Sequence, residues 1–168
     1  MKKALLIIDV QNDYFPGGKC QLYKPDLALD TIKNLLQEFR KRKLPIIYIQ
    51  HESIQGTFFN PDTEGIKIHH DIEPLSKEII VTKHYPNSFY KTDLQNKLVE
   101  NDVTELVVCG MMTHMCVDTT VRAAKDYGYK VILVSDACAT KDLEWDNSTL
   151  SAELVQKTYM ASLNQKFC

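Results

Sequence analysis

Cys116 is the residue of this sequence whose position best suits covalent chemistry. The apolar run at residues 106–109 predicts a buried strand, Gly110 predicts a tight turn, and a helix is expected to start at or just before Cys116. A thiol there lies near the positive end of the helix and near unpaired backbone N–H groups, which favour the thiolate. Cys116 is therefore a candidate nucleophile. The alternative role, a small buried apolar residue, is the one we expect for Cys109 and Cys138.

Two further reactive side chains follow predicted strands elsewhere in the chain. Asp9 closes the apolar run at residues 5–8, where partial desolvation favours a partner or a proton. It could be a general base for Cys116, or it could cap the following segment. Lys83 follows the strand expected at residues 79–82 and could stabilise both a thiolate and a carboxylate. Taken alone, a lysine in this position is more typical of the solvated surface.

His114 is the other possible partner of Cys116, since Cys–His pairs are common in nucleophilic catalysis. Side chains two residues apart on a helix point in different directions, however. We therefore expect His114 to line a pocket or an interface.

Alternating strands and helices must position these residues. Apolar runs predict strands, and helical periodicity predicts a helix at residues 27–43 with Leu27 on its buried stripe, next to Ile32, Leu35, Leu36 and Phe39. This pattern predicts an α/β protein, a three-layer α/β/α sandwich with a Rossmann-like, mostly parallel sheet of five to six strands, forming one domain over residues 1–168. The expected strands are 3–8, 46–50, 79–82, 105–109 and 130–135; the other expected helices are 92–101, 114–127 and 147–163; residues 51–76 form a long polar excursion.

In such sheets, functional residues gather beyond the carboxyl ends of the strands. Asp9, His51, Lys83, the turn before Cys116, and Asp136 each come just after a predicted strand. We therefore expect these residues to lie together at one edge of the sheet.

Composition limits the function classes. The 168 residues are 44% hydrophobic and 25% charged with a net charge of −2, which argues against nucleic acid as the partner. The sequence has no apolar run near the ~20 residues that span a membrane. The five cysteines show no paired spacing, so we expect free thiols in a reducing cytoplasm. We expect the partner to be a small-molecule substrate.

Several segments together resemble the isochorismatase-like cysteine hydrolase superfamily, and they are similar in motif to streptothricin hydrolases. They are residues 6–15 (LIIDVQNDYF), 82–89 (TKHYPNSF), 109–117 (CGMMTHMCV), 119–124 and 134–140. The resemblance implies a catalytic triad of Asp9, Lys83 and Cys116. It also implies a cis peptide between Met111 and Met112, and an oxyanion hole made of the N–H groups of Met112 and Cys116.

The activity implied is hydrolysis of a C–N bond in a small amide, lactam or ureido compound through a thioester on the cysteine. The alternatives are vinyl-ether hydrolysis of the isochorismatase type and a non-catalytic binding module. Members of the superfamily are commonly homodimers or higher oligomers. Their sheet usually has a sixth strand after the last helix, and this chain ends at Cys168, where that strand would begin. A very short or missing last strand is therefore expected.

Substrate-binding groups are less well defined by the sequence. Phe15 and Phe89 could line an apolar pocket together with His114, although core packing is an equal alternative for both rings. Trp145 could reach a site or an interface. Nicotinamidases of the superfamily bind a metal through Asp-x-His after the second strand, a motif that is missing here. We therefore expect no metal and no cofactor, with solvent-facing roles for His51, Glu52, His69 and His70.

Overall fold

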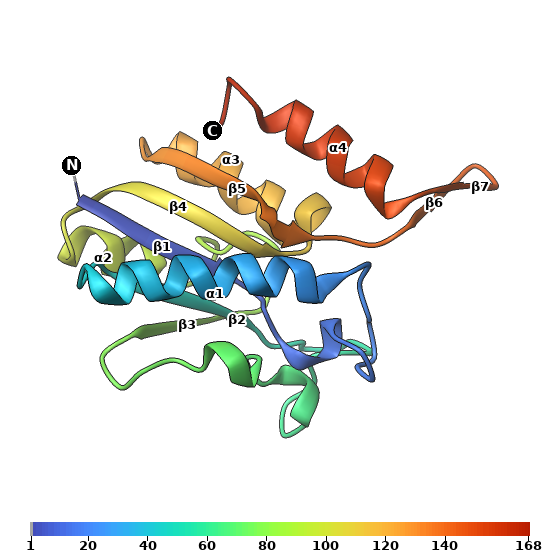
Figure 1. Cartoon of the computed structure of the whole chain (residues 1–168), viewed down its shortest axis with the longest axis horizontal. Helices are drawn as coiled ribbons and strands as arrows, with labels where there is room; N and C mark the ends of the chain where they lie inside the picture. The colour runs from blue at the N-terminus through green and yellow to red at the C-terminus, as the bar shows by residue number, and fades with distance from the viewer. Residues whose placement is uncertain (1) are drawn as a thin grey trace.

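The computed structural model describes residues 2–168 and has a parallel five-stranded sheet between two helical layers (Figure 1). The strand order is β3-β2-β1-β4-β5, and every neighbouring pair is parallel. The strands are β1 (Lys2–Ile8), β2 (Ile46–His51), β3 (Ile79–Lys83), β4 (Val103–Met111) and β5 (Lys130–Ala139). The predicted α/β/α sandwich is confirmed.

Both faces of the sheet are covered by helices. Leu5 and Ile7 of β1 pack under α1 (Pro25–Lys41), while Leu6 and Ile8 face α2 (Leu94–Glu100) and α3 (Asp118–Asp126). A strand that is buried on both faces needs apolar residues at successive positions, which explains the continuous run in β1. The last helix, α4 (Ala152–Leu163), lies beside α3 beyond β5 (Figure 1).

Helix α1 begins two residues earlier than predicted. Pro25 occupies its first turn, where a missing N–H costs nothing. The buried stripe includes Ala28, Leu29 and Ile32, whereas Leu27 is 64% exposed. The prediction that Leu27 belongs to the core was therefore wrong.

The largest departure from the predicted elements lies before α4. A hairpin of β6 (Leu143–Trp145) and β7 (Ser148–Leu150) occupies the segment where the last helix was expected to begin. Asp146 and Asn147 both have positive φ, 49° and 57°, as a type I′ hairpin turn requires. The helix itself starts at Ala152, after Ser151 accepts a hydrogen bond from the Leu154 N–H.

Two other regions differ in detail. β5 continues to Ala139, so the exposed Asp136 lies within the strand and not beyond its end. The polar excursion after β2 contains two short 3₁₀ helices, η2 (Glu64–Ile66) and η3 (His70–Ile72). In residues 2–168, no strand follows α4, and none of the helices combines the length and apolar character needed to cross a bilayer.

Gly110 allows β4 to run close to β1 near the carboxyl edge of the sheet. Its φ is +124°, and a Cβ there would collide with the carbonyl oxygen of Ile8. The close approach brings the end of β1 next to the turn that follows β4.

Candidate active site

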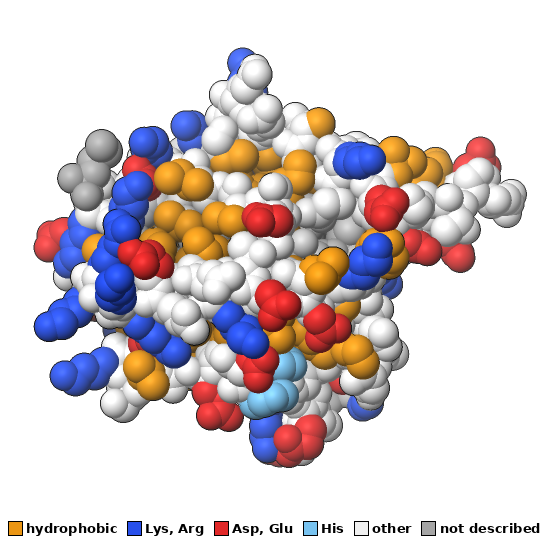
Figure 2. Space-filling model, in the orientation of Figure 1, with side chains coloured by type: hydrophobic (Ala, Val, Ile, Leu, Met, Phe, Trp, Pro, Cys, Tyr) orange, Lys and Arg blue, Asp and Glu red, His pale blue; other side chains and the backbone are white. Residues whose placement is uncertain are grey.

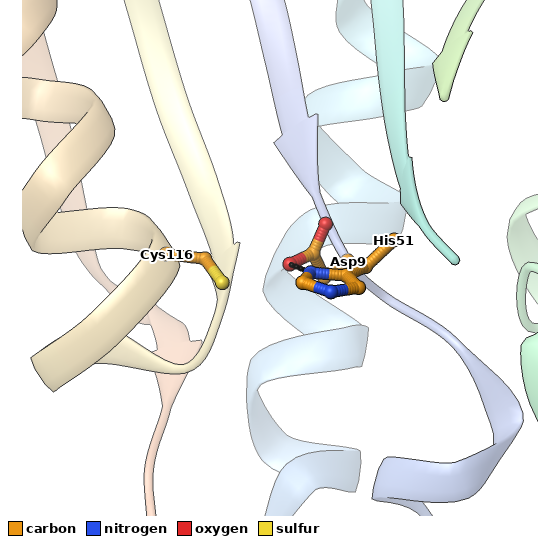
Figure 3. A group of neighbouring side chains, drawn as sticks. All are labelled: Asp9, His51 and Cys116. Atoms are coloured by element: carbon orange, nitrogen blue, oxygen red, sulfur yellow. Dashed lines mark ion pairs between the residues drawn. The ribbon is translucent and has the colours of Figure 1, made fainter. Parts of the chain in front are cut away.

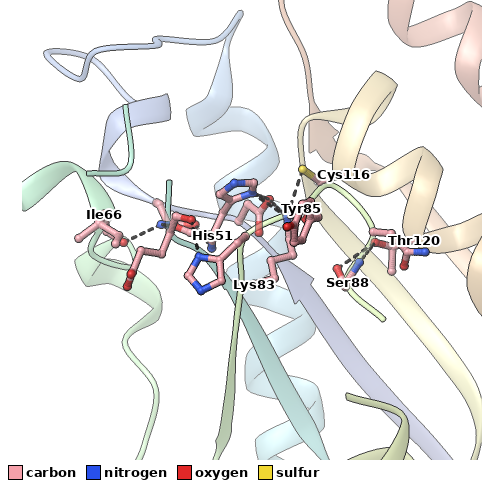
Figure 4. Close-up of polar contacts among 12 residues, drawn as sticks. His51, Ile66, Lys83, Tyr85, Ser88, Cys116 and Thr120 are labelled. Carbon is pink, nitrogen blue, oxygen red and sulfur yellow. Dashed lines mark hydrogen bonds and ion pairs between the residues drawn. The ribbon is translucent and has the colours of Figure 1, made fainter. Parts of the chain in front are cut away.

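Asp9, Lys83 and Cys116 converge at the carboxyl edge of the sheet. The Lys83 Nζ lies 2.8 Å from Asp9 Oδ2 and donates a hydrogen bond of 3.2 Å to Cys116 Sγ (Figure 4). All three side chains are buried, and the Cys116 residue is only 3% exposed. Three segments far apart in sequence therefore bring a carboxylate, an ammonium and a thiol into direct contact.

The strand order explains why a lysine is used. Asp9 directly follows β1 and has a positive φ of 51°, and its N–H donates to the Ile49 carbonyl of β2. Lys83 ends β3, the edge strand, with β2 between it and β1. Only a long side chain can reach the Asp9 carboxylate across an intervening strand.

Cys116 sits in the first turn of an unusual helix. The turn after β4 has a cis peptide between Met111 and Met112, as the resemblance predicts, and continues into the π-helix η4 (Thr113–Val117). The Met112 carbonyl accepts hydrogen bonds from the N–H groups of both Met115 and Val117, at 3.0 and 3.2 Å. Cys116 lies between these two residues, and its side chain faces Asp9 (Figure 3).

The protonation pattern differs from the expected thiolate. Burial and then the Asp9 carboxylate raise the pKa of Cys116, and Lys83 offsets this only in part. Burial opposes ionisation of Asp9, but the Lys83 ammonium outweighs it and lowers the pKa of Asp9. Burial disfavours the Lys83 ammonium, but Asp9 and Cys116 raise its pKa. The resting cluster is thus a carboxylate, an ammonium and a neutral thiol, because one ammonium balances only one negative charge.

The Asp9 carboxylate keeps its acceptor capacity. Its Oδ2 is paired with Lys83 at 2.8 Å, whereas Oδ1 has no hydrogen-bond partner within residues 2–168. A carboxylate oxygen of Asp9 and the sulfur of Cys116 lie within 4.8 Å of each other. Free lone pairs beside a thiol are what a proton acceptor requires.

His51 also belongs to this cluster, and the prediction of a solvent-facing role was wrong for it. Its side chain is 19% exposed, and its Nδ1 lies 2.9 Å from Lys83 Nζ but 3.7 Å from Asp9 Oδ2. An ammonium only donates, so Nδ1 accepts and the imidazole carries its proton on Nε2. His51 pairs in register with Lys83 across β2 and β3, which agrees with the expectation that both residues lie at the same edge of the sheet.

Gln11 fixes the backbone at His51. Its side-chain oxygen accepts from the His51 N–H at 2.8 Å, and its amide nitrogen donates to the His51 and Ile66 carbonyls at 2.8 and 2.7 Å. The residue is fully buried, so these bonds replace water. The sequence analysis missed Gln11, although it lies in one of the segments that carry the resemblance.

A pair of buried hydroxyls connects the Lys83 loop to the Cys116 helix. Ser88 Oγ and Thr120 Oγ1 are 2.8 Å apart, and the Ser88 N–H donates to Thr120 Oγ1 at 3.1 Å (Figure 4). Thr120 is four residues after Cys116, one turn along the helix. This pair therefore sets the distance between the segments that carry the lysine and the thiol.

The remaining predicted site residues lie around this centre. The Phe15 ring is buried against His69, with 4.3 Å between ring centroids. Phe89 is buried and packs on Tyr127 and Tyr129, with 4.9 and 6.2 Å between ring centroids. His114 Nδ1 lies 2.6 Å from Thr140 Oγ1, consistent with the expectation that it does not pair with Cys116.

Aromatic rings also lie near the cluster, since the ring centroids of Phe59 and His51 are 5.9 Å apart. Tyr14 and Phe59 are fully buried and meet edge to face at 4.7 Å. Burial, and after it Cys116, raise the pKa of Tyr14. The Phe59 N–H donates to Asp13 Oδ2 at 2.7 Å, which fastens the polar excursion over this region.

The donor atoms of Asp9, His51 and Cys116 lie close enough together to hold a metal ion. The Lys83 Nζ, however, lies 2.8, 2.9 and 3.2 Å from these same atoms. A metal ion would have to displace a buried ammonium that already neutralises the carboxylate. The arrangement therefore does not fit a resident metal.

A second group, His69, His70 and Asp71, lies at η3. It is mostly exposed, and Lys33 Nζ is 3.0 Å from Asp71 Oδ2. Glu52 follows the end of β2 and is half-buried. Among these residues, Glu52 contacts the buried cluster, since its N–H donates to the Lys83 carbonyl at 2.9 Å.

The fold and the buried cluster define an α/β enzyme with a cysteine, a carboxylate and a lysine at the carboxyl edge of a parallel sheet. The chain belongs to the isochorismatase family: the isochorismatase domain model matches residues 3–162. It is a hydrolase, as members of this family are.

Similar proteins cover nearly the whole chain. The isochorismatase family protein YddQ of Bacillus subtilis is 49% identical over 166 residues, which are 98% of this chain and 92% of the relative. A crystal structure titled as an isochorismatase hydrolase from Oleispira antarctica superposes with a TM-score of 0.97 at 40% identity, covering 99% of this chain and 91% of the other. Streptothricin hydrolase of Streptomyces noursei is 35% identical over 143 residues, 84% of this chain and 51% of the relative.

Proposed function

We propose that this hydrolase cleaves a C–N bond in a small amide, lactam or ureido compound through a thioester on Cys116. One observation carries the proposal: the Lys83 ammonium contacts both the Asp9 carboxylate and the Cys116 thiol. Similarity to a streptothricin hydrolase supports the choice of a cysteine hydrolase. Asp9, Lys83 and Cys116 form the proposed catalytic triad.

The first step is a proton transfer inside the buried cluster. Asp9 takes the proton of the Cys116 thiol as the sulfur attacks the substrate carbonyl. A carboxylate becomes neutral and a thiolate appears, so the net charge of the cluster stays at zero around the Lys83 ammonium. Lys83 therefore stabilises the negative charge both on Asp9 and on the Cys116 thiolate, and it neither gives nor takes a proton.

The second step breaks the C–N bond. The negative oxygen of the tetrahedral intermediate rests on the N–H groups of Met112 and Cys116, which flank the start of η4. Protonated Asp9 gives its proton to the leaving nitrogen, and the amine departs while the acyl group stays on sulfur. Asp9 then takes a proton from water, whose oxygen attacks the thioester, and the acid and the free thiol are released.

The closed surroundings support a small acyl group. Cys116 is 3% exposed, and the Phe59 ring, which packs on Tyr14, lies 5.9 Å from the His51 ring. We propose that Phe15 and His114 border the wider pocket. The His51 Nε2–H, directed away from the Lys83 contact, is available as a donor to a polar substrate group.

We further propose that residues 1–168 act as one domain in a reducing compartment, the cytoplasm. All five cysteines are free thiols, which suits such an environment. The two hydrophobic core clusters lie on the two faces of one five-stranded sheet, which supports one domain.

Substrate screening tests the proposal. The purified protein is incubated with small amides, lactams, ureido acids and streptothricin, and the release of ammonia or amine is followed. Turnover that disappears in Cys116→Ala is expected for at least one compound class. Turnover that survives in Cys116→Ala, or cleavage of vinyl ethers but of no C–N bond, contradicts it.

A further inference from the structure

Gln156 connects helix α4 to the turn in which Cys116 lies. Its side-chain oxygen accepts a hydrogen bond of 2.6 Å from the Thr113 hydroxyl, and its side-chain nitrogen donates to the Ser135 carbonyl of β5 at 3.0 Å. An amide oxygen only accepts and an amide nitrogen only donates, so the two contacts fix the orientation of the Gln156 side chain. Three elements, α4, β5 and η4, therefore meet at one amide group.

Thr113 is the first residue of η4 and is fully buried. Its hydroxyl oxygen lies 2.6 Å from Gln156 Oε1 and 3.2 Å from the Ala139 carbonyl. A hydroxyl has a single hydrogen to donate, and the shorter contact assigns that hydrogen to Gln156. The buried hydroxyl thus depends on Gln156 for its hydrogen bond, and a buried donor without a partner is costly.

The end of β5 approaches the same turn from the side. Ala139 is paired in register with Met111, and His114 Nδ1 lies 2.6 Å from Thr140 Oγ1. The first two residues of η4 are therefore both bonded through their side chains to neighbouring elements. The start of this short helix is held from outside as well as by its own backbone.

The two proposed oxyanion donors lie on either side of Thr113. The Met112 N–H belongs to the residue before it, and the Cys116 N–H follows three residues later within η4. The Met112 carbonyl accepts hydrogen bonds from two N–H groups of η4, so the peptide between Met112 and Thr113 anchors the helix. A displacement of that peptide would move both donors relative to the Cys116 sulfur.

We propose that Gln156 is a positioning residue for the oxyanion hole. Through Thr113, it holds the N–H groups of Met112 and Cys116 where they receive the negative oxygen of the tetrahedral intermediate. This inference rests on the proposed function, which generates that oxygen. Gln156 acts through Thr113 and not on the substrate, so its loss should resemble a misplaced donor, which costs up to about 10²-fold in rate for a displacement near 1 Å.

The surroundings of Gln156 make it suitable for substitution. It is half-buried and lines a groove of about 480 Å³ between the start of α1, the end of β5 and α4. Figure 2 shows this face, with apolar side chains exposed between α1 and α4. Leucine is a good helix former and matches an apolar groove wall, so Gln156→Leu should remove the two hydrogen bonds and keep the fold.

Turnover of a substrate found by screening gives the first test. Gln156→Leu and Thr113→Val should each lower kcat by roughly 10–10²-fold and leave KM unchanged, because the oxyanion forms only after the substrate is bound. The double variant should be no slower than either single variant, since both changes remove the same hydrogen bond. Thr113→Ser keeps the hydroxyl and should restore kcat.

Butyraldehyde gives a second test that needs no turnover. The Cys116 sulfur adds to the aldehyde carbon, and the carbonyl oxygen takes the thiol proton by way of Asp9, so the tetrahedral adduct places its oxygen at the proposed oxyanion hole. Reversible protection of Cys116 from iodoacetamide measures the affinity. Gln156→Leu should weaken this protection but react with iodoacetamide alone at the wild-type rate, because alkylation forms no oxyanion.

Lys157→Leu is the matched control, since Lys157 is the next residue of α4 and lines the same groove. It should change neither kcat nor the protection by butyraldehyde. Wild-type kcat and protection in Gln156→Leu, slower alkylation of that variant, a failed rescue by Thr113→Ser, or equal losses in Lys157→Leu would each overturn the role of Gln156 and leave the proposed function standing. Full turnover in Cys116→Ala would overturn both.

Discussion

The Lys83 ammonium and the Asp9 carboxylate form a fully buried ion pair, with 2.8 Å between Nζ and Oδ2. Each group stabilises the charge of the other in a site that is buried from solvent. Removing only one partner leaves an isolated charge, whose cost in a buried site is about 3–5 kcal/mol.

The substitution Lys83→Met should therefore lower both the free energy of unfolding at pH 7 and the activity. Urea denaturation should show a loss of about 3–5 kcal/mol. The double variant Asp9→Asn/Lys83→Met, which has no buried charge, should recover much of the stability but none of the activity. Equal stability of the single and double variants would argue against the pair.

Asp9→Asn should move two properties of Cys116 in opposite directions. The Asp9 carboxylate raises the pKa of Cys116, so its removal lowers that pKa and leaves Lys83 to stabilise a thiolate. Alkylation of Cys116 by iodoacetamide at pH 7, followed on its own peptide by mass spectrometry, should accelerate. Turnover should fall by roughly 10²–10⁴-fold because the proton acceptor is lost.

The control for this prediction is Asp13→Asn, a buried carboxylate outside the proposed triad. It should not accelerate alkylation of Cys116. If Asp9→Asn slows alkylation as well as turnover, the assigned resting state of a neutral thiol is wrong.

The free energy of unfolding should be highest over a middle range of pH and should fall at both lower and higher pH. The pKa of Asp9 is lowered in the folded state, so its contribution is present above the ordinary value of about 3.9 and disappears as the pH falls through the folded pKa. The pKa of Cys116 is raised, so the unfolded chain loses that proton first above about pH 8.5 and stability falls as the pH rises.

Urea unfolding from pH 3 to 10 under reducing conditions measures both declines. Asp9→Asn should reduce the acid decline, and Cys116→Ala should reduce the alkaline decline. Unchanged alkaline behaviour in Cys116→Ala would show that other groups, such as surface lysines, determine it.

The Ser88–Thr120 pair should position the nucleophile. Thr120→Val leaves the buried Ser88 hydroxyl without this partner, which costs about 1–3 kcal/mol of stability. It should lower kcat more than it changes KM, because Lys83 and Cys116 lose their fixed spacing. Thr120→Ser keeps the hydroxyl and should restore kcat; failure of this rescue would mean that packing alone matters.

The carboxyl-edge rule was enough to place Asp9, Lys83 and Cys116 at one end of the sheet, because parallel strands end side by side. The rule failed for Asp136, because the apolar run predicted a strand at residues 130–135 and β5 continues to Ala139. The rule also placed His51 at this edge, but it could not predict the contact of His51 with Lys83, which depends on the register between two strands. Such pairing is a tertiary relationship and leaves no local pattern.

The β6–β7 hairpin was missed for a different reason. Asp146 and Asn147 are typical of a type I′ turn, but the strands beside them have only three residues and no buried face. Apolar alternation is therefore absent, and the helical pattern of α4 was extended across them. Leu27 was assigned to the buried stripe of the helix by periodicity, although its position in α1 leaves it 64% exposed.

A covalent acyl group on Cys116 is the central claim, and mass spectrometry of the reacting enzyme tests it most directly. A substrate found by screening is mixed with the enzyme and quenched in acid during turnover, and the peptide that contains Cys116 is analysed. The account predicts an added mass equal to the acyl fragment, which hydroxylamine removes. Turnover with no such adduct, combined with full activity of Cys116→Ala, would contradict it.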